Sequence, residues 1–566
     1  MSRPHSVVEL PLQTTARGLE VLNSPQLNKG TGFTVAERTE LGLTGLLPPE
    51  ISTLAAQARR AYFHYERLPD ALSKNIYLTA LHDRNEVLFY RVFSEHLREM
   101  IPVVNDFTVG QALQQYHHEF RRPRGVYLSI NHPDSIEEAF ANFGAGVADI
   151  DLILATDAEQ ILGLGDWGIG GIEVAIGKLA IYTAAGGIDP KRVMPVMLDV
   201  GTNRPELLAD PMYAGNRHRR IRGERYDAFI DAYVKAATSR FPNALMQWED
   251  FAPLNGRRIL KKYRGSLCMF NDDMQGTGAI TLAAAISAVR VSGIPLRSQR
   301  IVIFGAGTAG MGIADQLRGS MIREGLSPEA AARRFWCVDR QGLLTTSMPE
   351  PLHEYQAAYA RPAAESQSWK CDKSGIGLAE VVQRVRPTML IGASTDGGGF
   401  TEAIIRNMAA QTERPIIFAL SIPPAQAEAT PADLIAWTDG RALIATGTPS
   451  VPVTHRGVTY VVAQLINAML YPGLGLGAIV SRARHISDGM FAAAASAVSS
   501  LVTVFQPGAS LLPQIDDLRS VSLTVAVAVA EAAEEEGLAT VPLHDIVEQV
   551  QAAMWQPEYR RIEAIK

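Results

Sequence analysis

Cysteine is scarce in this chain, and neither sign of charge is in large excess. Its 566 residues include three cysteines, which are widely spaced and odd in number. They form neither a disulfide framework nor a Cys-x-x-Cys metal site, so we expect a cytoplasmic protein in a reducing compartment. Fifty-three basic and 59 acidic residues give a formal net charge of −6. This balance argues against nucleic acid as a partner, because nucleic-acid-binding surfaces carry clustered basic residues.

The sequence also lacks a signal peptide and a clear membrane span. Met1–Thr15 shows no basic stretch followed by an apolar one. A stretch without charged residues runs from Met490 to Pro513, but it is interrupted by Pro507 and Gly508. We therefore expect a buried helix followed by a loop in this stretch, and no membrane association.

Apolar residues, 47% of the chain, recur in patterns that predict an α/β fold. Between about Thr34 and Glu119 they repeat near helical spacing. Helical and strand-like runs then alternate, which favours mostly parallel sheets with helices on both faces. The expected strands are 126–130, 150–155, 193–198, 244–247, 300–304, 335–338, 388–392, 416–420 and 442–446, with helices at 172–183 and 226–240 among those between them.

The segment IVIFGAGTAGMGIADQL, residues 301–317, is typical of a dinucleotide site. An apolar run leads into three glycines spaced as Gly-x-Gly-x-x-Gly and then into a helical pattern. The first glycine permits a tight turn, the second lets the backbone approach a pyrophosphate, and the third lets helix and strand pack closely. Free N–H groups at the start of the helix suit the phosphates. The expected cofactor-binding residues here are Gly305, Gly307, Thr308, Ala309 and Gly310.

The next apolar run ends in Asp339. A carboxylate there accepts hydrogen bonds from the adenine-ribose hydroxyls, which favours NAD over NADP. The adjacent Arg340 is suited to a 2′-phosphate, so NADP stays open as the alternative. Asp339 lies farther from the glycines than the usual distance of about 20 residues, and we expect a long helix between them.

Acidic residues follow three of the apolar runs, as the pairs Asp157/Glu159, Glu249/Asp250 and Asp272/Asp273. With no His or Cys nearby, a cluster of carboxylates suits Mg²⁺ or Mn²⁺, which prefer oxygen ligands. Taken singly, each acid is better explained as a surface or capping residue.

Lys178 stands in the run VAIGKLAIYTA, whose other residues are almost all apolar. Such a lysine either extends its amine to solvent along an apolar surface or is buried. Burial would lower its pKa towards that of a working base. The surrounding residues leave both interpretations open.

Taken together, these segments resemble the malic enzyme family, including its malolactic branch. The likeness covers about 22–560 and is carried by FRRPRGVYLSI (120–130), TDAEQILGLGDWGIGG (156–171), IGKLAIYTAAGGI (176–188), LDVGTN (198–203), WEDFA (248–252), FNDDMQGTG (270–278), FGAGTAG (304–310), TERPIIFALS (412–421), ALIATG (442–447) and YPGLGLG (471–477). The opening, 20–34, is more similar to malolactic enzymes, and MWQPEYR (554–560) to bacterial NAD-malic enzymes.

The resemblance implies four parts and a homodimer or homotetramer. These parts are a helical N-terminal region at 1–120, an α/β catalytic domain at 121–275, a Rossmann-type NAD-binding domain at 276–465, and a helical segment at 466–566 that returns to the catalytic domain. It also implies NAD- and metal-dependent oxidative decarboxylation of malate, or of a related 2-hydroxydicarboxylic acid, to a 2-oxo acid, CO₂ and NADH. From malate the product is pyruvate.

Site roles follow from the same resemblance. Lys178 matches the general base that removes the substrate hydroxyl proton, and Asp272 matches a supporting carboxylate beside it. Ser394 joins the NAD-binding positions. The metal positions are Glu249, Asp250 and Asp273, for Mg²⁺ or Mn²⁺.

The chain departs from the family where substrate is bound. Asn105 stands in place of a tyrosine that acts as general acid, and an amide has no acid form; Asp106 is a possible substitute. Gln160 replaces an arginine that binds a substrate carboxylate in oxidative malic enzymes and that malolactic enzymes also lack. Ile422 replaces the asparagine of a Ser-Asn-Pro turn. The segment 463–467 matches the Gly-Gln-Gly-Asn-Asn segment of the family, and of its two asparagines only the last, Asn467, is kept.

Retention of the metal, base and cofactor positions favours an active enzyme, with a larger or less charged acid than malate as a candidate substrate. Arg121 or Arg122 is an alternative group for a substrate carboxylate. Three other functions stay open. The first is malolactic decarboxylation of malate to lactate with NAD retained. The second is the same chemistry on a different 2-hydroxy acid, and the third is a non-catalytic NAD-binding protein.

Overall fold

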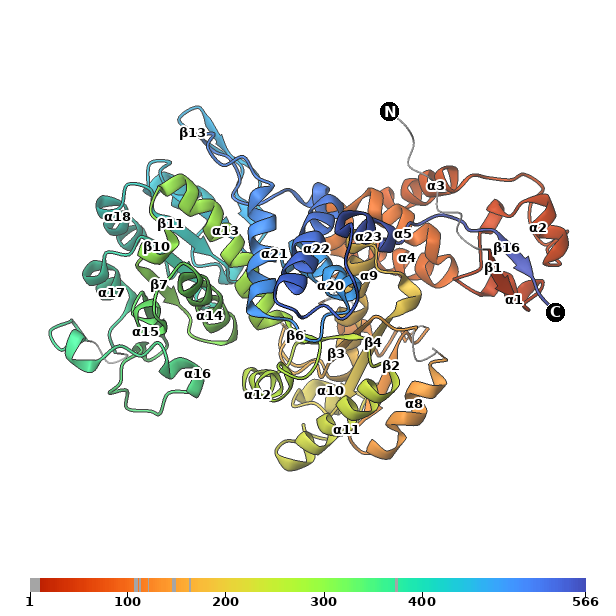
Figure 1. The fold of residues 1–566 in the computed structure, drawn as a ribbon, viewed down its shortest axis with the longest axis horizontal. Coiled ribbons are helices and arrows are strands. Elements are labelled where there is room, and N and C mark those ends of the chain that lie inside the picture. The colour runs from red at the N-terminus through yellow and green to blue at the C-terminus, as the bar shows by residue number, and fades with distance from the viewer. Residues whose placement is uncertain are drawn as a thin grey trace.

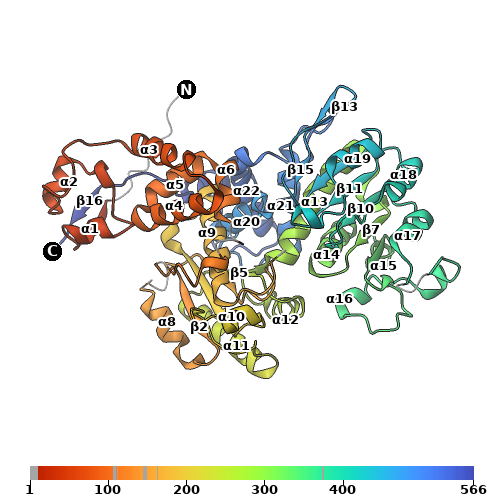
Figure 2. The ribbon, with the colours of Figure 1, turned by 180° about the vertical axis from the view of Figure 1, so that it is seen from behind.

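Two parallel β-sheets organise the molecule, and a helical region extends from one end of it (Figures 1 and 2). The computed structural model describes residues 11–105, 110, 113–120, 122–144, 149–161, 164–371 and 375–566. The predicted α/β class with parallel sheets is confirmed. Antiparallel pairing between the named strands that the structure describes is confined to β8 with β9 and β13 with β14.

The first sheet is entirely parallel, with the order β2-β4-β3-β5-β6. Its strands are β2 (Val126–Ser129), β3 (Leu152–Thr156), β4 (Val193–Asp199), β5 (Leu245–Glu249) and β6 (Met269–Asn271). Every residue of β3, β4 and β5 is buried, since strands inside a parallel sheet are covered on both faces. Strand β6 is not among the predicted strands, because it has only three residues and shows no clear periodicity.

Helices pack on both faces of this sheet. They are α8 (Ile136–Asn142), α9 (Ile172–Gly186), α10 (Pro205–Ala209), α11 (Glu224–Arg240) and α12 (Pro253–Tyr263). Among described residues, one window, Gly168–Gly186, is long and apolar enough to cross a membrane. Of that window 78% is buried inside the protein, and its helix α9 contacts β3 and β4. These are properties of a core helix.

The second sheet has the order β15-β12-β11-β10-β7-β8-β9. Its strands are β7 (Ile301–Phe304), β8 (Phe335–Asp339), β9 (Gly342–Leu343), β10 (Met389–Gly392), β11 (Ile416–Ala419), β12 (Leu443–Thr446) and β15 (Ala463–Gln464). The strand order reverses between β7 and β10. In open α/β sheets this reversal marks the crevice where ligands bind, at the carboxyl ends of the strands.

Helices and a hairpin complete this half of the chain. The helices are α13 (Thr277–Ser292), α14 (Thr308–Arg323), α15 (Pro328–Ala332), α16 (Glu354–Ala357), α17 (Leu378–Val385), α18 (Glu402–Gln411) and α19 (Pro431–Trp437), and the hairpin is β13 (Val453–His455) with β14 (Val458–Tyr460). Between the glycine turn and Asp339 the chain forms two helices, α14 and α15, in place of the single long helix that we expected.

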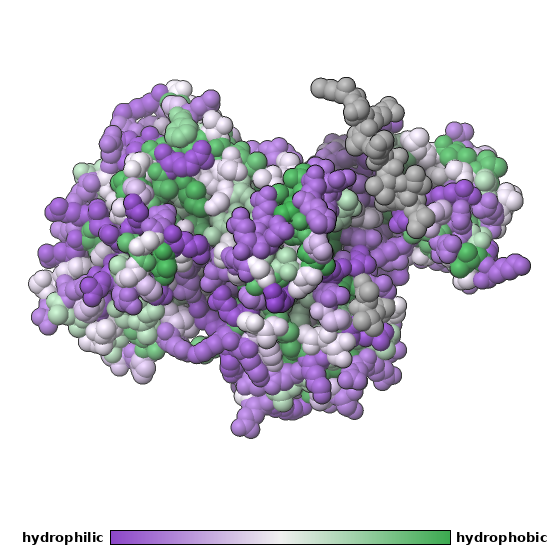
Figure 3. All heavy atoms as spheres, viewed as in Figure 1, coloured by the Kyte–Doolittle hydropathy of each residue, from purple (hydrophilic) through white to green (hydrophobic). Residues whose placement is uncertain are grey.

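The remaining helices belong to the N-terminal and C-terminal parts of the chain. They are α1 (Leu19–Asn23), α2 (Val35–Glu40), α3 (Leu54–Glu66), α4 (Ala71–Arg84), α5 (Glu86–Glu95), α6 (Leu97–Val104), α20 (Tyr471–Ser481), α21 (Asp488–Ser500), α22 (Leu518–Glu535) and α23 (Ile546–Ala553). Helix α20 packs against α9 and α22, so the segment after the second sheet returns to the first. Near the termini, β1 (Leu12–Thr14) pairs in parallel with β16 (Ile562–Ala564). On the face drawn in Figure 3, hydrophilic residues predominate and hydrophobic ones form small patches.

Candidate active site

Lys178 is buried, with 9% of its surface exposed, in helix α9. Its Nζ donates hydrogen bonds to Glu249 Oε1 at 2.5 Å and to Asp272 Oδ2 at 2.6 Å. It also lies 5.5 Å from the centre of the Tyr471 ring, at the start of α20. Of the two interpretations left open by the sequence, the structure therefore selects burial. The apolar neighbours of Lys178 cover its stem, and two carboxylates hold its charged end.

The carboxylates come together because β5 and β6 are parallel neighbours. Glu249 is the last residue of β5, and Asp250 follows it in a left-handed conformation with φ of 60°. Asp273 lies in a π-helical turn, Asp272–Gly276, directly after β6. Ligand oxygens of Glu249, Asp250 and Asp273 all lie within 4.8 Å of one another, and all three residues are buried. The Asp250 N–H donates to Asp273 Oδ2 at 2.9 Å.

This cluster has the donor set that a hard cation requires. Burial raises the pKa of Asp273 to about 7, and the neighbouring Asp250 carboxylate adds to the effect. The pKa of Asp250 is raised well above its usual value, first by burial and then by Glu249. Asp250 Oδ2 is buried and has no hydrogen-bond partner. A divalent cation would satisfy this oxygen and relieve the repulsion, so the residues fit Mg²⁺ or Mn²⁺.

The expected lowering of the Lys178 pKa is wrong for this structure. Burial does oppose the charged form, but the carboxylates of Asp272 and Glu249 outweigh it and hold the pKa well above 10.5. Pairing therefore dominates desolvation at this lysine. A cation shared by Glu249 would withdraw part of that negative charge, so the proton affinity of Lys178 depends on the metal site beside it.

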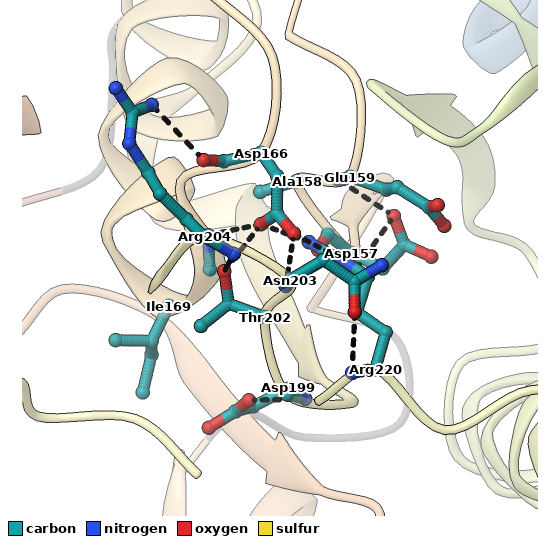
Figure 4. Close-up of polar contacts among 12 residues, drawn as sticks. Asp157, Ala158, Glu159, Asp166, Ile169, Asp199, Thr202, Asn203, Arg204 and Arg220 are labelled. Carbon is teal, nitrogen blue, oxygen red and sulfur yellow. Dashed lines mark hydrogen bonds and ion pairs between the residues drawn. The ribbon is translucent and has the colours of Figure 1, made fainter. Parts of the chain in front are cut away.

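The other expected acid pair does not join the cluster. Asp157 accepts a hydrogen bond from Tyr226 Oη at 2.7 Å, and burial raises its pKa to about 6. Glu159 is paired with Arg222. Both acids stabilise the loop that follows β3. In Figure 4 Arg220 connects Asp157 with Asp166, to which it donates two hydrogen bonds of 2.8 Å.

A cavity of about 290 Å³ opens beside Lys178, Glu249 and Asp250. Its lining comes from several parts of the chain: the first sheet with its loops and α9, Asn105 at the end of α6, helix α13, the second sheet around the glycine turn, and the returning segment that leads into α20. The lysine, the acid cluster and the end of the second sheet therefore share one cavity. No single one of these parts would enclose it.

Among the expected substrate residues, Asn105, Ile422 and Asn467 line this cavity. Asn467 Nδ2 donates to Asp272 Oδ2 at 3.0 Å and to Thr277 Oγ1 at 3.1 Å. Gln160 does not line it, because its side chain is exposed and only its backbone N–H reaches inward, to the Asp250 carbonyl at 2.9 Å.

Two of the alternative groups, Asp106 and Arg121, lie outside the described residues. Arg122 is described, and it does not line the cavity. One of its Nη atoms donates to the Asp83 carbonyl at 3.4 Å.

The glycine turn has the form that a dinucleotide site needs. Gly305 has a φ of 104°, and a Cβ there would lie 2.3 Å from the Ala393 carbonyl oxygen. A Cβ at Gly310 would lie 1.9 Å from the Gly305 carbonyl oxygen, so strand and helix approach closely only with glycine. Gly307 faces open space, where a phosphate can approach the start of α14. Ala309, on the first turn of that helix, lines the cavity.

The remaining cofactor positions lie around this turn. Asp339 ends β8, and one of its oxygens is 3.4 Å from Gln356 Nε2, which also donates to the Ala306 carbonyl at 2.9 Å. Arg340 is exposed. Ser394 follows β10 and does not itself line the cavity, whereas its neighbours Ala393 and Thr395 do.

Glu428 is a residue that sequence reasoning missed. It is fully buried and lies between the loops that follow β10 and β11. Its carboxylate accepts hydrogen bonds from the N–H and Oγ of Ser394 at 2.9 and 2.8 Å, and from Ser421 Oγ at 2.5 Å. A Cβ at Gly392 would approach this carboxyl carbon to 2.4 Å. The sequence carries only a partial signal for this residue. Glu428 is the one charged residue in the segment PPAQAEAT, 423–430, but this pattern does not reveal what its side chain contacts.

Comparisons with known proteins agree with this geometry. Residues 82–264 match the family model of the malic enzyme N-terminal domain, and residues 274–534 match that of the malic enzyme NAD-binding domain. NAD-dependent malic enzyme 3 of Bacillus subtilis is 57% identical over 556 residues, which are 98% of each chain. A malolactic enzyme of Leuconostoc mesenteroides is 44% identical over 96% of this chain and 99% of its own.

A solved structure supports the fold. The crystal structure of a malic enzyme from Pyrococcus horikoshii has a TM-score of 0.56 over 81% of this chain and 89% of its own, at 24% identity. The two matched domain models together cover most of the chain. Lys178, Glu249, Asp250 and the glycine turn lie within them, and Asp273 lies in the short stretch between them. The chain belongs to the malic enzyme family.

Proposed function

We propose that this protein catalyses NAD- and divalent-metal-dependent oxidative decarboxylation of malate, or of a related 2-hydroxydicarboxylic acid, to a 2-oxo acid, CO₂ and NADH. One observation carries the proposal. Lys178, paired with Asp272, shares a cavity with the Glu249–Asp250–Asp273 cluster and with the end of the dinucleotide-binding sheet. The base, the cation site and the hydride acceptor site are therefore adjacent.

In this proposal the residues of the chain divide the work. With a cation at the cluster, which would withdraw negative charge from Lys178 and lower its proton affinity, the neutral amine would accept the proton of the 2-hydroxyl group as a positioned general base. Asp272 holds the amine in place, and Asn467 in turn holds Asp272 through its 3.0 Å hydrogen bond. The three carboxylates would hold a cation, which would supply Lewis-acid stabilisation of the charge that develops as CO₂ leaves, and bound NAD would supply the hydride acceptor. The turn at Gly305–Gly310 orients the cofactor.

The test is NADH formation from L-malate and NAD⁺ in the presence of Mn²⁺, together with product analysis. We expect pyruvate, CO₂ and NADH in equal amounts, and no turnover after removal of the metal by chelation. Binding of NAD without turnover of any 2-hydroxy acid would instead indicate a non-catalytic NAD-binding protein. The buried and interlinked Lys178 site argues against that alternative.

Malolactic decarboxylation is the second candidate. It is favoured by the 44% identity to a malolactic enzyme over nearly the whole chain. The same assay separates the two reactions, because a malolactic enzyme would form lactate and CO₂ without net NADH.

Assembly and location complete the proposal. We propose a homodimer or homotetramer, which light scattering during gel filtration tests. We also propose a cytoplasmic location, supported by the scarcity of cysteine, three residues in 566.

A further inference from the structure

Part of the cavity lining, which we call the apolar wall, consists of aliphatic side chains. Ile161 and Leu164 come from the loop after β3, and Leu420 and Ile422 come from the end of β11. Leu465 and Ile466 come from the segment before α20. Leu420, Leu465 and Ile466 are only partly buried and pack against the large core. Core packing therefore holds these side chains in place, and their exposed parts line the cavity.

Positive charge is nearly absent from the described lining. Lys178 is the one lysine, arginine or histidine among those residues, and two carboxylates already neutralise it. Most of the neutral donors have partners as well. Ser421 Oγ donates to Glu428, and Asn467 Nδ2 to Asp272. The other neutral polar groups of the lining include the amides of Asn105 and Gln464 and the hydroxyls of Thr277 and Tyr471. Among the lining residues that the structure describes, a group at the apolar wall therefore meets aliphatic side chains and no cationic side chain.

We propose, on the basis of the function above, that the preferred substrate is a malate that carries an apolar alkyl group on C3. Its C1 carboxylate and 2-hydroxyl group face Lys178 and the acid cluster, and the alkyl group lies against Leu465, Ile466 and Ile422. Burying aliphatic carbon against these side chains is favourable, whereas a bare carboxylate there lacks partners.

The chemistry is unchanged and balanced. Hydride leaves C2 for NAD⁺, and the hydroxyl proton passes to Lys178. The bond between C3 and its carboxylate breaks, CO₂ departs, and the electron pair stays on C3 as an enolate. A proton returned to C3 gives the 2-oxo acid that keeps the alkyl group.

Steady-state kinetics on the full-length protein with NAD⁺ and Mn²⁺ test this inference. The probes are L-malate and its 3-methyl, 3-ethyl and 3-isopropyl derivatives. We expect kcat/KM to rise along this series by at least about tenfold, mainly through KM, since one methylene in an apolar pocket is worth about tenfold or more. A fall along the series, with malate the best substrate, would overturn the inference. No NADH from any of the four acids would instead contradict the proposed oxidative function.

A matched pair of variants, Ile466→Val and Ile466→Thr, separates polarity from size. Val and Thr have nearly the same volume, but Thr replaces a methyl group by a hydroxyl. We expect Thr to lower kcat/KM for 3-isopropylmalate by about tenfold and Val by about threefold or less, as for a lost apolar contact. Equal effects of Val and Thr on the alkylmalates would contradict contact with this wall. NAD affinity, from fluorescence titration, reports whether each variant folds.

Discussion

The two walls of the cavity are built in different ways. In the charged wall Lys178, Glu249 and Asp272 are buried and joined by hydrogen bonds of 2.5 and 2.6 Å. The apolar wall includes Ile422 and Ile466, which are partly exposed and have aliphatic side chains. Removing one charge from the first wall leaves its buried partners uncompensated, which is costly. Exchanging one aliphatic group for another in the second wall costs little. We therefore expect substitutions in the charged wall to impair the reaction itself, and substitutions in the apolar wall to change which substrate is preferred.

The largest expected effect is on the charged wall. Lys178→Ala should lower kcat by about 10²–10⁴-fold, the usual contribution of a general base, and leave NAD affinity close to wild type. Initial rates and fluorescence titration with NAD measure the two quantities. Lys29→Ala is the control, because Lys29 is also a buried lysine paired with a glutamate, Glu37, but far from the cavity. A Lys178→Ala enzyme within about tenfold of wild type would exclude the general-base role.

The second effect concerns the acid cluster. Asp273→Asn keeps the size of the side chain and its acceptor for the Asp250 N–H, but removes one charged ligand. We expect Mn²⁺ affinity to fall by at least about 100-fold, since loss of outer-shell partners alone costs about 10–100-fold. Electron paramagnetic resonance of free Mn²⁺ measures this without an activity assay. Asp231→Asn, at an exposed acid on α11, is the control. Equal Mn²⁺ affinity in both variants would contradict the assigned site.

The substitution Asn105→Tyr tests whether the charged wall lacks a group that protonates the enolate. Asn105 lines the cavity, and its Oδ1 lies where a Cβ on Gly177, next to Lys178, would approach to 3.0 Å. A phenol there would protonate the enolate, so kcat for malate should rise by at least about tenfold. Asn105→Phe has nearly the same size without the hydroxyl and should give no gain. A similar kcat in both variants would show that another group supplies the proton.

Glu428 links the loop after β10 to the loop after β11 through hydrogen bonds with Ser394 and Ser421. Glu428→Ala removes the acceptor of the Ser394 and Ser421 groups, and unpaired buried donors destabilise both loops. We expect KM for NAD to rise by about tenfold, the equivalent of one lost hydrogen bond of about 1.4 kcal/mol, with a smaller change in kcat. Glu428→Gln keeps one acceptor oxygen and should show an effect of intermediate size. A uniform loss of kcat without a change in KM would instead indicate a purely structural role.

The smallest effect lies away from both walls. His82 is buried between Arg124, Glu86 and Asp83, and burial lowers its pKa from 6.5 to about 4, with Arg124 adding to the shift. The folded state therefore keeps it neutral while the unfolded state takes up a proton between these values. The stability that neutral His82 contributes to the folded state is therefore complete above pH 6.5 and is lost as the pH falls towards 4. We expect the protein to be about 2 kcal/mol less stable at pH 5 than at pH 8 through this group alone.

Thermal unfolding across this pH range measures the effect. In His82→Gln the amide still accepts from Arg124 but does not titrate, so the loss of stability at low pH should be smaller. An unchanged pH dependence in this variant would contradict the assignment. The ratio of kcat/KM values for malate and 3-alkylmalates should stay the same, because His82 lines neither wall.

Much of the fold was predictable because local pattern and environment agree. The expected strands at 193–198 and 416–420 differ from β4 and β11 by one residue at the C-terminal end, since continuous apolar runs form strands that are buried on both faces. The turn at Gly305–Gly310 was predictable because its geometry needs glycine at fixed spacing. The acid cluster was identifiable only through the resemblance to malic enzymes. Each acid by itself fits a capping or surface residue, as Glu159 shows by pairing with Arg222.

The sequence by itself determined the α/β class, the dinucleotide turn and the family, because each depends on residues close together in the chain or on whole motifs. Only the tertiary structure decided that Lys178 is buried and charged, since its partners Glu249 and Asp272 lie 71 and 94 residues away. The tertiary structure also left Gln160 exposed, buried Glu428 between two loops, and brought Ile422 and Ile466 to the cavity that Lys178 lines. The physical reason is that distance, burial and pairing between remote residues follow from how strands are ordered, which local periodicity does not encode.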